Sequence, residues 1–288
     1  MKHQFSKIHL LTHEAIQETY LPVSKYAHKG SNGVGILIAG SRQMPGAAML
    51  AARAAMRSGL GKLIVHAPAS VLDKVIPYLP EAILSFDTHS NFLSDIPDRL
   101  QNCDALAIGP GLGKESYTQK ALYNILTKFS HPMIVDADAL NILAENREWF
   151  SLLPEKSILT PHARECDRLT GESPNRFERT MKIVDFAHKF KIIVILKGHL
   201  STIVFPDGNI FLNPTGNQGM ATAGCGDVLT GIILGLLAKG YSPENAAKTG
   251  VFLHGLAGDF ALLQQSHESL VASDIIENLG QAFLEITA

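Results

Sequence analysis

Short, continuously apolar segments alternate along this chain with longer segments of helical character. Most of these apolar segments end in glycine or in polar residues. Continuous apolar character is typical of strands that are buried on both faces of a sheet, and strands joined by helices form parallel sheets with right-handed crossovers. The predicted strands are Val34–Ala39, Lys62–Ala67, Ala82–Phe86, Asp104–Ile108, Met133–Asp136, Ser157–Thr160 and Ile192–Leu196.

The segments between and after these strands are predicted to be helical. Pro45–Ser58 is rich in alanine, which has the highest helix propensity, and Gly59 and Gly61 end it. The other predicted helices are Thr12–Tyr20, Val71–Tyr78, Tyr117–Phe129, Ala139–Ala144, Arg176–Phe190, Val228–Ala238, Pro243–Leu263 and Ser273–Ile286.

The pattern changes after the last of the predicted strands. Ser201–Phe205 and Asn209–Leu212 flank Pro206-Asp207-Gly208, which predicts a β-hairpin. The sequence shows no internal repeat, low-complexity tract or linker. Residues 1–288 are therefore predicted to form one α/β domain with a mainly parallel sheet.

Charge and composition exclude several classes of protein. The formal net charge is −2, so no basic excess indicates binding to nucleic acid or to a membrane surface. The three cysteines are widely spaced and odd in number, so we expect neither a CxxC metal site nor a disulfide framework. The longest apolar stretch, Val228–Ala238, is too short to span a bilayer, and no signal peptide is recognisable. We expect a soluble, cytoplasmic protein.

A glycine-rich loop, Asn213–Gly226, leads through a single acid into an apolar helical run. Backbone N–H groups at such a helix start point at a ligand, and the partial positive charge there favours anions. Asp227 is unusual because it lies where an anion is expected. Either it acts chemically on a group beside the bound anion, or it is an ordinary helix N-cap.

Including this loop, six polar or glycine-rich segments follow predicted strands. In open α/β sheets, ligands bind beyond the carboxyl ends of the strands, so we expect these segments to lie near one another. They are Gly40-Ser41, Gly109–Gly113, Asp136–Asp138, Thr160–His162, Lys197-Gly198 and Asn213–Asp227.

Two of these segments have more than one interpretation. Gly109–Gly113 does not match a dinucleotide fingerprint, because it lies in mid-chain and contains a proline; it forms either a tight turn or a backbone wall for a ligand. Asp138 is a possible cap of the next helix, whereas Asp136, at a strand end, suits orienting a polar ligand or holding hydrated Mg²⁺ through water.

His162, Lys197 and Cys225 each have alternative interpretations as well. If a helix starts at His162, the spacing of His162 and Glu165 places them on one helical face, but without a second histidine we favour hydrogen bonding to a ligand or loop over zinc binding. Lys197 follows a strand and either meets a phosphate or is solvated. Cys225 has no histidine or second thiol near it in sequence, so we favour a packing role over a nucleophile.

Six motifs in order carry a resemblance to a known family. They are PGAAMLAARAAMRSGLGKLIV, AIGPGLG, VDADALN, LTPHARECDRLTG, LKGHLSTIV and NPTGNQGMATAGCGDVLTGII. From about Lys29 onward, the chain resembles the ADP/ATP-dependent NAD(P)H-hydrate dehydratases of the ribokinase-like superfamily. The family usually has GGSGD where this chain has Ala223-Gly224-Cys225-Gly226-Asp227.

The resemblance implies a three-layer α/β/α fold and an activity. The activity is ADP-dependent dehydration of the S epimer of hydrated NADH and NADPH, NADHX and NADPHX, giving NAD(P)H, AMP and phosphate. Mg²⁺ is the implied cofactor, ADP or ATP the co-substrate and a homotetramer the implied assembly. The epimerase domain fused to some family members is expected to be absent.

The resemblance also implies roles for single residues. Asp227 is the implied catalytic base. Ala47, Gly111, Gly113, His162 and Asp227 are implied to face the hydrate; Lys197, Gly198, His199, Leu200, Ser201, Asn217, Ala223, Gly224, Cys225 and Gly226 to bind the nucleotide; and Asp136, Asn141 and Glu165 to hold Mg²⁺ through water.

Two other functions remain open from the sequence. A small-molecule kinase of the same superfamily, of the hydroxyethylthiazole or pyridoxal type, shares the GxGD motif and would release a stable phosphorylated alcohol. A non-catalytic nucleotide-binding sensor would bind nucleotide without turnover, but an acid beside a phosphate gives a pure binder no advantage.

Overall fold

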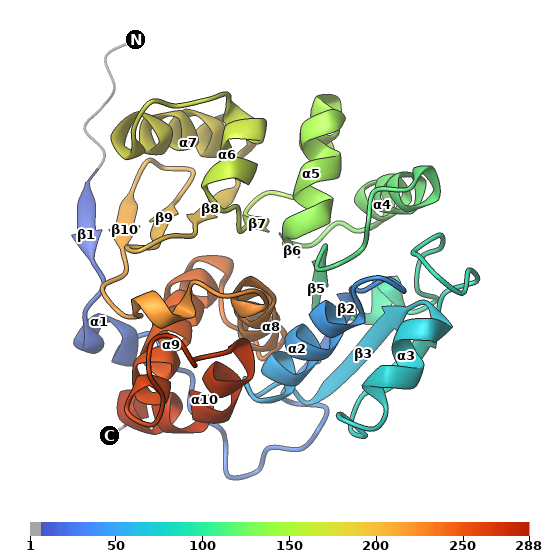
Figure 1. Ribbon diagram of the computed structural model, residues 1–288, viewed down its shortest axis with the longest axis horizontal. Coiled ribbons are helices and arrows are strands. Elements are labelled where there is room, and N and C mark those ends of the chain that lie inside the picture. The colour runs from blue at the N-terminus through green and yellow to red at the C-terminus, as the bar shows by residue number, and fades with distance from the viewer. Residues whose placement is uncertain (1–6, 288) are drawn as a thin grey trace.

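A computed structural model describes residues 7–287 and shows one continuous ten-stranded sheet (Figure 1). The strand order is β1-β10-β9-β8-β7-β6-β5-β2-β3-β4. The strands are β1 Ile8–Leu10, β2 Val34–Ile38, β3 Lys62–Ala67, β4 Ile83–Phe86, β5 Ala105–Ile108, β6 Met133–Val135, β7 Ile158–Leu159, β8 Ile193–Leu196, β9 Thr202–Val204 and β10 Ile210–Leu212. Only β9 runs antiparallel to its neighbours among these strands, so the prediction of a mainly parallel sheet is confirmed.

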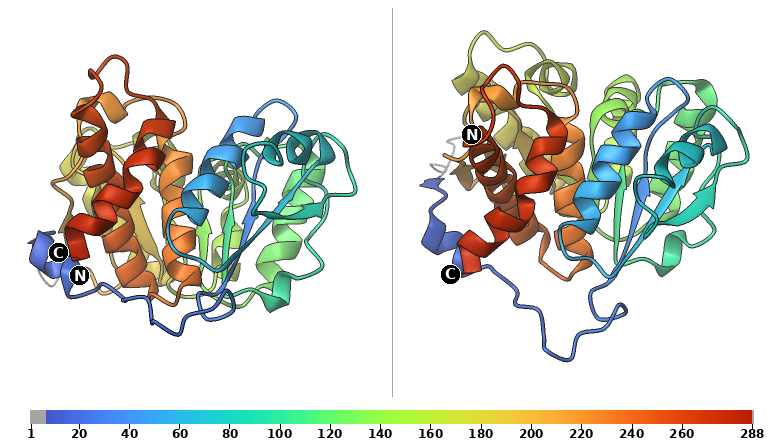
Figure 2. Two further views of the ribbon diagram at one scale, coloured as in Figure 1. Left: turned by 90° about the horizontal axis from the view of Figure 1, so that it is seen from below. Right: turned by 60° about the horizontal axis from the view of Figure 1, so that its bottom comes forward.

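Helices cover both faces of the sheet and bury two separate apolar cores (Figures 1 and 2). One face carries α1 His13–Gln17, α2 Pro45–Met56, α3 Ala69–Val75, α8 Cys225–Ala238, α9 Pro243–Leu262 and α10 Ala272–Thr287. The other carries α4 Ser116–Lys128, α5 Ala137–Glu145, α6 Ala163–Thr170 and α7 Arg176–Phe190. This is the predicted three-layer arrangement. In residues 7–287, no helix combines the length and apolar character needed to span a membrane.

Helices α8 and α2 pack side by side on the same face of the sheet, and the glycines of α8 make their close contact possible. A Cβ atom at Gly231 would overlap the carbonyl oxygen of Ala51 and lie 2.8 Å from the Cβ of Ala54. A Cβ atom at Gly235 would lie 2.5 Å from that of Ser58. The alanines of α2 and the glycines of α8 therefore let the two backbones approach closely, which fixes the start of α8 relative to the sheet.

The predicted strands, helices and hairpin all occur, with boundaries that differ by a few residues. The sequence analysis missed two elements. The edge strand β1 is short and exposed, and it pairs in parallel with β10 about 200 residues later in the chain, at Ile8 and Ile210. The other missed element, α6, has a polar sequence with few apolar residues.

The strand order reverses between β2 and β5, because the chain first adds β3 and β4 on one side and then β5 to β8 on the other. Such a switch point leaves a crevice at the carboxyl ends of the strands. The segments that leave β2 and β5 meet here, since the N–H of Gly40 donates to the carbonyl of Pro110 at 2.7 Å.

Candidate functional site

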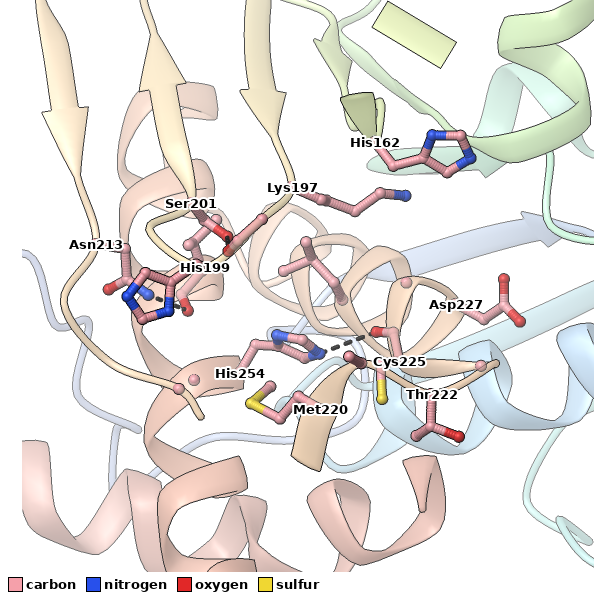
Figure 3. A pocket seen from close by; sticks show the side chains of 18 of the residues that line it. His162, Lys197, His199, Ser201, Asn213, Met220, Thr222, Cys225, Asp227 and His254 are labelled. Atoms are coloured by element: carbon pink, nitrogen blue, oxygen red, sulfur yellow. Dashed lines mark hydrogen bonds between the residues drawn. The ribbon is translucent and has the colours of Figure 1, made fainter. Parts of the chain in front are cut away.

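A cavity of about 610 Å³ opens beyond the carboxyl ends of β6, β7, β8 and β10, next to the start of α8 (Figure 3). It brings together four of the predicted strand-exit segments, those containing Asp136, His162, Lys197 and Asp227. Helix α9 adds Val251, His254 and Gly255. Asp227 and Asn213 lie at opposite ends of the view in Figure 3.

Gly224, not Asp227, occupies the N-cap position of α8, so the interpretation of Asp227 as a helix cap is wrong. Gly224 has a left-handed backbone (φ 92°), and a Cβ atom there would lie 2.5 Å from Cδ1 of Leu50 and 3.0 Å from the Cβ of Ala272. No side chain accepts a capping hydrogen bond from the first turn. Because the first N–H groups of a helix lack partners within it, this end of α8 suits an anion.

Asp227 lies in the first turn of α8 and lines the cavity. Burial raises the pKa of Asp227 to about 7, and the negative charges of Asp136, Asp138 and Glu165 add to this, while Lys197 opposes it. A carboxylate whose pKa lies near the working pH is suited to accept a proton and release it again.

Asp136 joins Lys197 to α8. Its buried carboxylate accepts hydrogen bonds from Nζ of Lys197 and from Oγ1 of Thr230, both at 2.7 Å, and it does not cap its own helix α5. Burial alone would lower the pKa of Lys197, but the charges of Asp136 and Glu165 outweigh this and raise it, so the ammonium group stays charged.

Gly226 leaves room for this ammonium group beside the first turn of α8. A Cβ atom at Gly226 would lie 3.1 Å from Nζ of Lys197. A fixed positive charge and the helix N-terminus therefore face the same part of the cavity, which is the arrangement that phosphate groups require.

The loop Gly109–Gly113 is a tight turn held against α5. A Cβ atom at Gly109 would overlap the carbonyl oxygen of Asp136, so this close approach requires glycine. Asp138 is not the cap of α5; its Oδ2 accepts a hydrogen bond from the N–H of Gly113 at 2.9 Å. Gly111 lies beside Ala47, since a Cβ at Gly111 would be 2.9 Å from that of Ala47. These residues lie near the switch point and are outside the lining of the main cavity.

His162 and Glu165 form a capping box at the start of α6. The N–H of Glu165 donates to Nδ1 of His162 at 3.1 Å, and the N–H of His162 donates to Oε2 of Glu165 at 2.8 Å. Histidine is not a usual capping residue, which explains why the sequence analysis missed this helix. His162 therefore hydrogen-bonds within its own loop, as favoured from the sequence. Its half-exposed ring also lines the cavity.

The three residues predicted to hold Mg²⁺ do not converge. Asp136 and Glu165 line the main cavity, whereas Asn141 accepts from Nη1 of Arg168 at 2.6 Å and lines a separate surface hollow. Among residues 7–287, no group of three His, Cys, Asp or Glu side chains is arranged to hold a metal ion.

Most residues predicted to bind nucleotide do line the cavity. They are Lys197, Gly198, His199, Ser201, Asn217, Gly224, Cys225 and Gly226. Leu200 and Ala223 are not part of the lining, and the carbonyl of Leu200 accepts from Arg176. Asn217 is held in place by α9, because its Nδ2 donates to the carbonyl of Gly258 at 2.9 Å and to Asp259 at 3.0 Å.

Cys225 is buried, and this burial raises the pKa of its thiol to about 11. The thiol is therefore neutral at pH 7, which favours the packing role. Several residues of the site were not predicted from the sequence, and two of them make hydrogen bonds there. Thr230 follows Asp227 by one helical turn, a spacing that could have been noticed, and His254 is an isolated polar residue within an apolar helix.

The chain matches the model of the NAD(P)H-hydrate dehydratase family over residues 35–281. It is 36% identical over 277 residues to the ADP-dependent (S)-NAD(P)H-hydrate dehydratase of Bacillus subtilis, covering 94% of this chain and 98% of that protein. It is 37% identical over 265 residues to the bifunctional NAD(P)H-hydrate repair enzyme of Moorella thermoacetica, covering 88% of this chain but only 49% of that longer protein.

Solved structures agree with the sequence matches. The ADP/ATP-dependent NAD(P)H-hydrate dehydratase from Bacillus subtilis, co-crystallised with ATP and Mg²⁺, superposes with a TM-score of 0.82 at 33% identity, covering 96% of this chain and 98% of that one. A ribokinase-like superfamily protein from Enterococcus faecalis superposes with a TM-score of 0.86 at 28% identity over the full length of both chains. The fold is therefore ribokinase-like.

Proposed function

Because this chain belongs to the NAD(P)H-hydrate dehydratase family, we propose that it restores NADH and NADPH from the S epimers of their hydrates, with ADP as co-substrate and AMP and phosphate as the other products. The observation that carries this proposal is the position of Asp227. Its partly buried carboxyl group, with a pKa of about 7, lies in the first turn of α8 beside a glycine-lined cavity and a charged lysine.

The chemistry follows from these groups. Asp227 accepts the proton of the hydroxyl on C6 of the nicotinamide ring while that oxygen attacks the terminal phosphoryl group of ADP, which releases AMP. The N–H groups of the first turn of α8 and the Lys197 ammonium stabilise the charge on the transferred group. Phosphate then leaves C6, assisted by electrons from the ring nitrogen, and loss of a proton from the neighbouring carbon restores the ring.

We assign the two ends of the site to the two substrates. The cavity around Lys197, Gly198, His199, Ser201, Asn217 and Gly224–Gly226 takes the nucleotide. The hydrate approaches Asp227 from the switch point, past Ala47, Gly111, Gly113 and His162. This division is supported by the hydrogen bond between the exits of β2 and β5, and by the packing of Gly111 against α2.

We further propose that Asp136 and Glu165, which both line the cavity, would hold Mg²⁺ through water beside the nucleotide phosphates. When bound, Mg²⁺ would neutralise phosphate charge. ATP is proposed as a second acceptable co-substrate. A homotetramer in the cytoplasm is proposed by resemblance to the family, and light scattering on purified protein tests the assembly.

The activity is tested by incubating the protein with NADHX, ADP and Mg²⁺ and following the absorbance of the reduced nicotinamide. We expect it to return, with AMP and phosphate released in equal amounts. Asp227→Asn keeps the size of the side chain but cannot act as a base, so we expect kcat to fall by about 10²- to 10⁴-fold. Near-normal turnover in this variant would contradict the role of Asp227. A stable phosphorylated product would instead indicate a kinase.

A further inference from the structure

His254 projects from α9 into the cavity and is held by one of its two ring nitrogens (Figure 3). Its Nε2 lies 2.9 Å from the carbonyl oxygen of Cys225, in the first turn of α8. A carbonyl oxygen only accepts hydrogen bonds, so Nε2 carries a proton and donates it. In a neutral imidazole the other nitrogen, Nδ1, then has a free lone pair.

The ring is neutral at physiological pH. Burial lowers the pKa of His254 to about 4, and the charge of Lys197 acts in the same direction. Nδ1 is therefore a hydrogen-bond acceptor. In Figure 3 it is turned away from Cys225, and no group within residues 7–287 donates a hydrogen bond to it.

The polar groups around His254 are already used to hold the cavity together. Asn213 Nδ2 donates to the carbonyl of Val251 at 3.3 Å and to Oγ1 of Thr215 at 2.9 Å. Thr215 in turn donates to the carbonyl of Phe252 at 2.9 Å. These bonds fasten the loop after β10 onto α9. His254 is thus the side chain of α9 that offers an unused acceptor to a ligand.

The position of His254 along the cavity indicates what such a ligand would present. If phosphates lie at the start of α8, as the proposed function requires, the nucleoside extends from there toward Asn213 and passes the ring of His254. We propose that His254 is a specificity-determining residue, whose Nδ1 accepts a hydrogen bond from a donor on the nucleoside, either a ribose hydroxyl or the amino group of adenine. The inference rests on the proposed function for the place of the phosphates.

The test compares dissociation constants of four nucleoside diphosphates by calorimetry. ADP has all the donors; 2′-deoxy-ADP and 3′-deoxy-ADP each lack one ribose hydroxyl, and IDP lacks the amino group. The proteins are the wild type, His254→Phe, His254→Met and His254→Gln. His131→Phe is the control, since it makes the same exchange at an exposed histidine of the loop before β6. Thermal melting identifies the variants that fold as the wild type does.

We expect the wild type to bind one of the three analogues about tenfold more weakly than ADP, the effect of one lost hydrogen bond. The analogue affected identifies the donor. In a folded apolar variant, His254→Phe or His254→Met, that difference should disappear, because ADP binding falls to the level of the analogue. His254→Gln should recover part of it, since its amide both donates and accepts.

Two results overturn the inference. One is equal binding of all four nucleotides by the wild type; the other is a difference that persists unchanged in the folded apolar variants. If NADHX and ADP are still turned over in either case, the proposed function stands and only the role of His254 falls. If the wild type neither binds ADP nor turns over the hydrate, both fall.

Discussion

At the scale of single residues, the charges around Asp227 predict how activity depends on pH. Because burial and three neighbouring acids raise the pKa of Asp227 to about 7, the free carboxyl group is largely protonated at pH 6. A protonated base is inactive, so kcat/KM for the hydrate should rise about tenfold per pH unit below 7 and level off above it. A profile that is flat between pH 5 and 8 would contradict the assignment of Asp227 as the base.

Asp136 sets part of this pH dependence. It is the first of the neighbouring acids that raise the pKa of Asp227, and it also holds Lys197. In Asp136→Asn the repulsion disappears and the attraction of Lys197 remains, so the acid limb of the pH profile should move to lower pH. Thr230→Val removes the other hydrogen bond of Asp136 without changing charge, and its limb should stay in place. If the acid limb of the pH profile lies at the same pH in Asp136→Asn and in Thr230→Val, the charge of Asp136 does not set the pKa of Asp227.

The sequence indicated some of these residues and not others, for a physical reason. Asp227, Lys197 and Asp136 follow strands or glycines, and parallel strands bring their ends to one edge of a sheet. Thr230 and His254 lie within helices, and their roles depend on where α8 and α9 pack. No local pattern encodes the hydrogen bond between His254 and the carbonyl of Cys225, because it joins residues on different helices.

At the scale of the elements, the sequence was informative wherever local pattern decides the structure. Continuous apolar runs predicted the buried strands correctly, since burial on both faces leaves little room for polar residues. β1 was missed because its three residues are exposed and form a strand only by pairing with β10. The contact between α2 and α8 was also not predictable, although the alanines of α2 and the glycines of α8 are its cause.

That contact gives a prediction about stability. Gly231→Ala would force a Cβ atom against the carbonyl of Ala51, so we expect it to lower the free energy of unfolding by about 1–3 kcal/mol or more. Gly280→Ala is the matched control, because a Cβ at this exposed position of α10 meets nothing within 4 Å. Alanine there should raise the free energy of unfolding by about 0.5–1 kcal/mol. Urea unfolding measures both, and a change of the same sign in the two variants would contradict the packing argument.

At the scale of the whole molecule, the cavity joins parts of the chain that are far apart in sequence. β6, β8, α8 and α9 each contribute to it, and it lies on the carboxyl side of a sheet whose two faces are covered by separate helical layers. A nucleotide that fills the cavity would bridge these elements. Its binding energy should therefore stabilise the fold as a unit, and ADP at 100 times its dissociation constant should add about 2.7 kcal/mol to the free energy of unfolding.

This stabilisation should depend on the place of the Lys197 ammonium group. In Gly226→Ala the new Cβ would lie 3.1 Å from Nζ, and the end of a flexible side chain can move away at little cost to the folded state. The variant without ligand should therefore melt close to the wild type, whereas the rise in melting temperature caused by ADP should shrink, because the new methyl group takes up space between Nζ of Lys197 and the first turn of α8, where the phosphates are proposed to bind. Gly280→Ala should keep the full rise. If ADP stabilises Gly226→Ala as much as the wild type, then Lys197 and the first turn of α8 do not act together on the nucleotide phosphates, and the cavity binds ADP by other contacts.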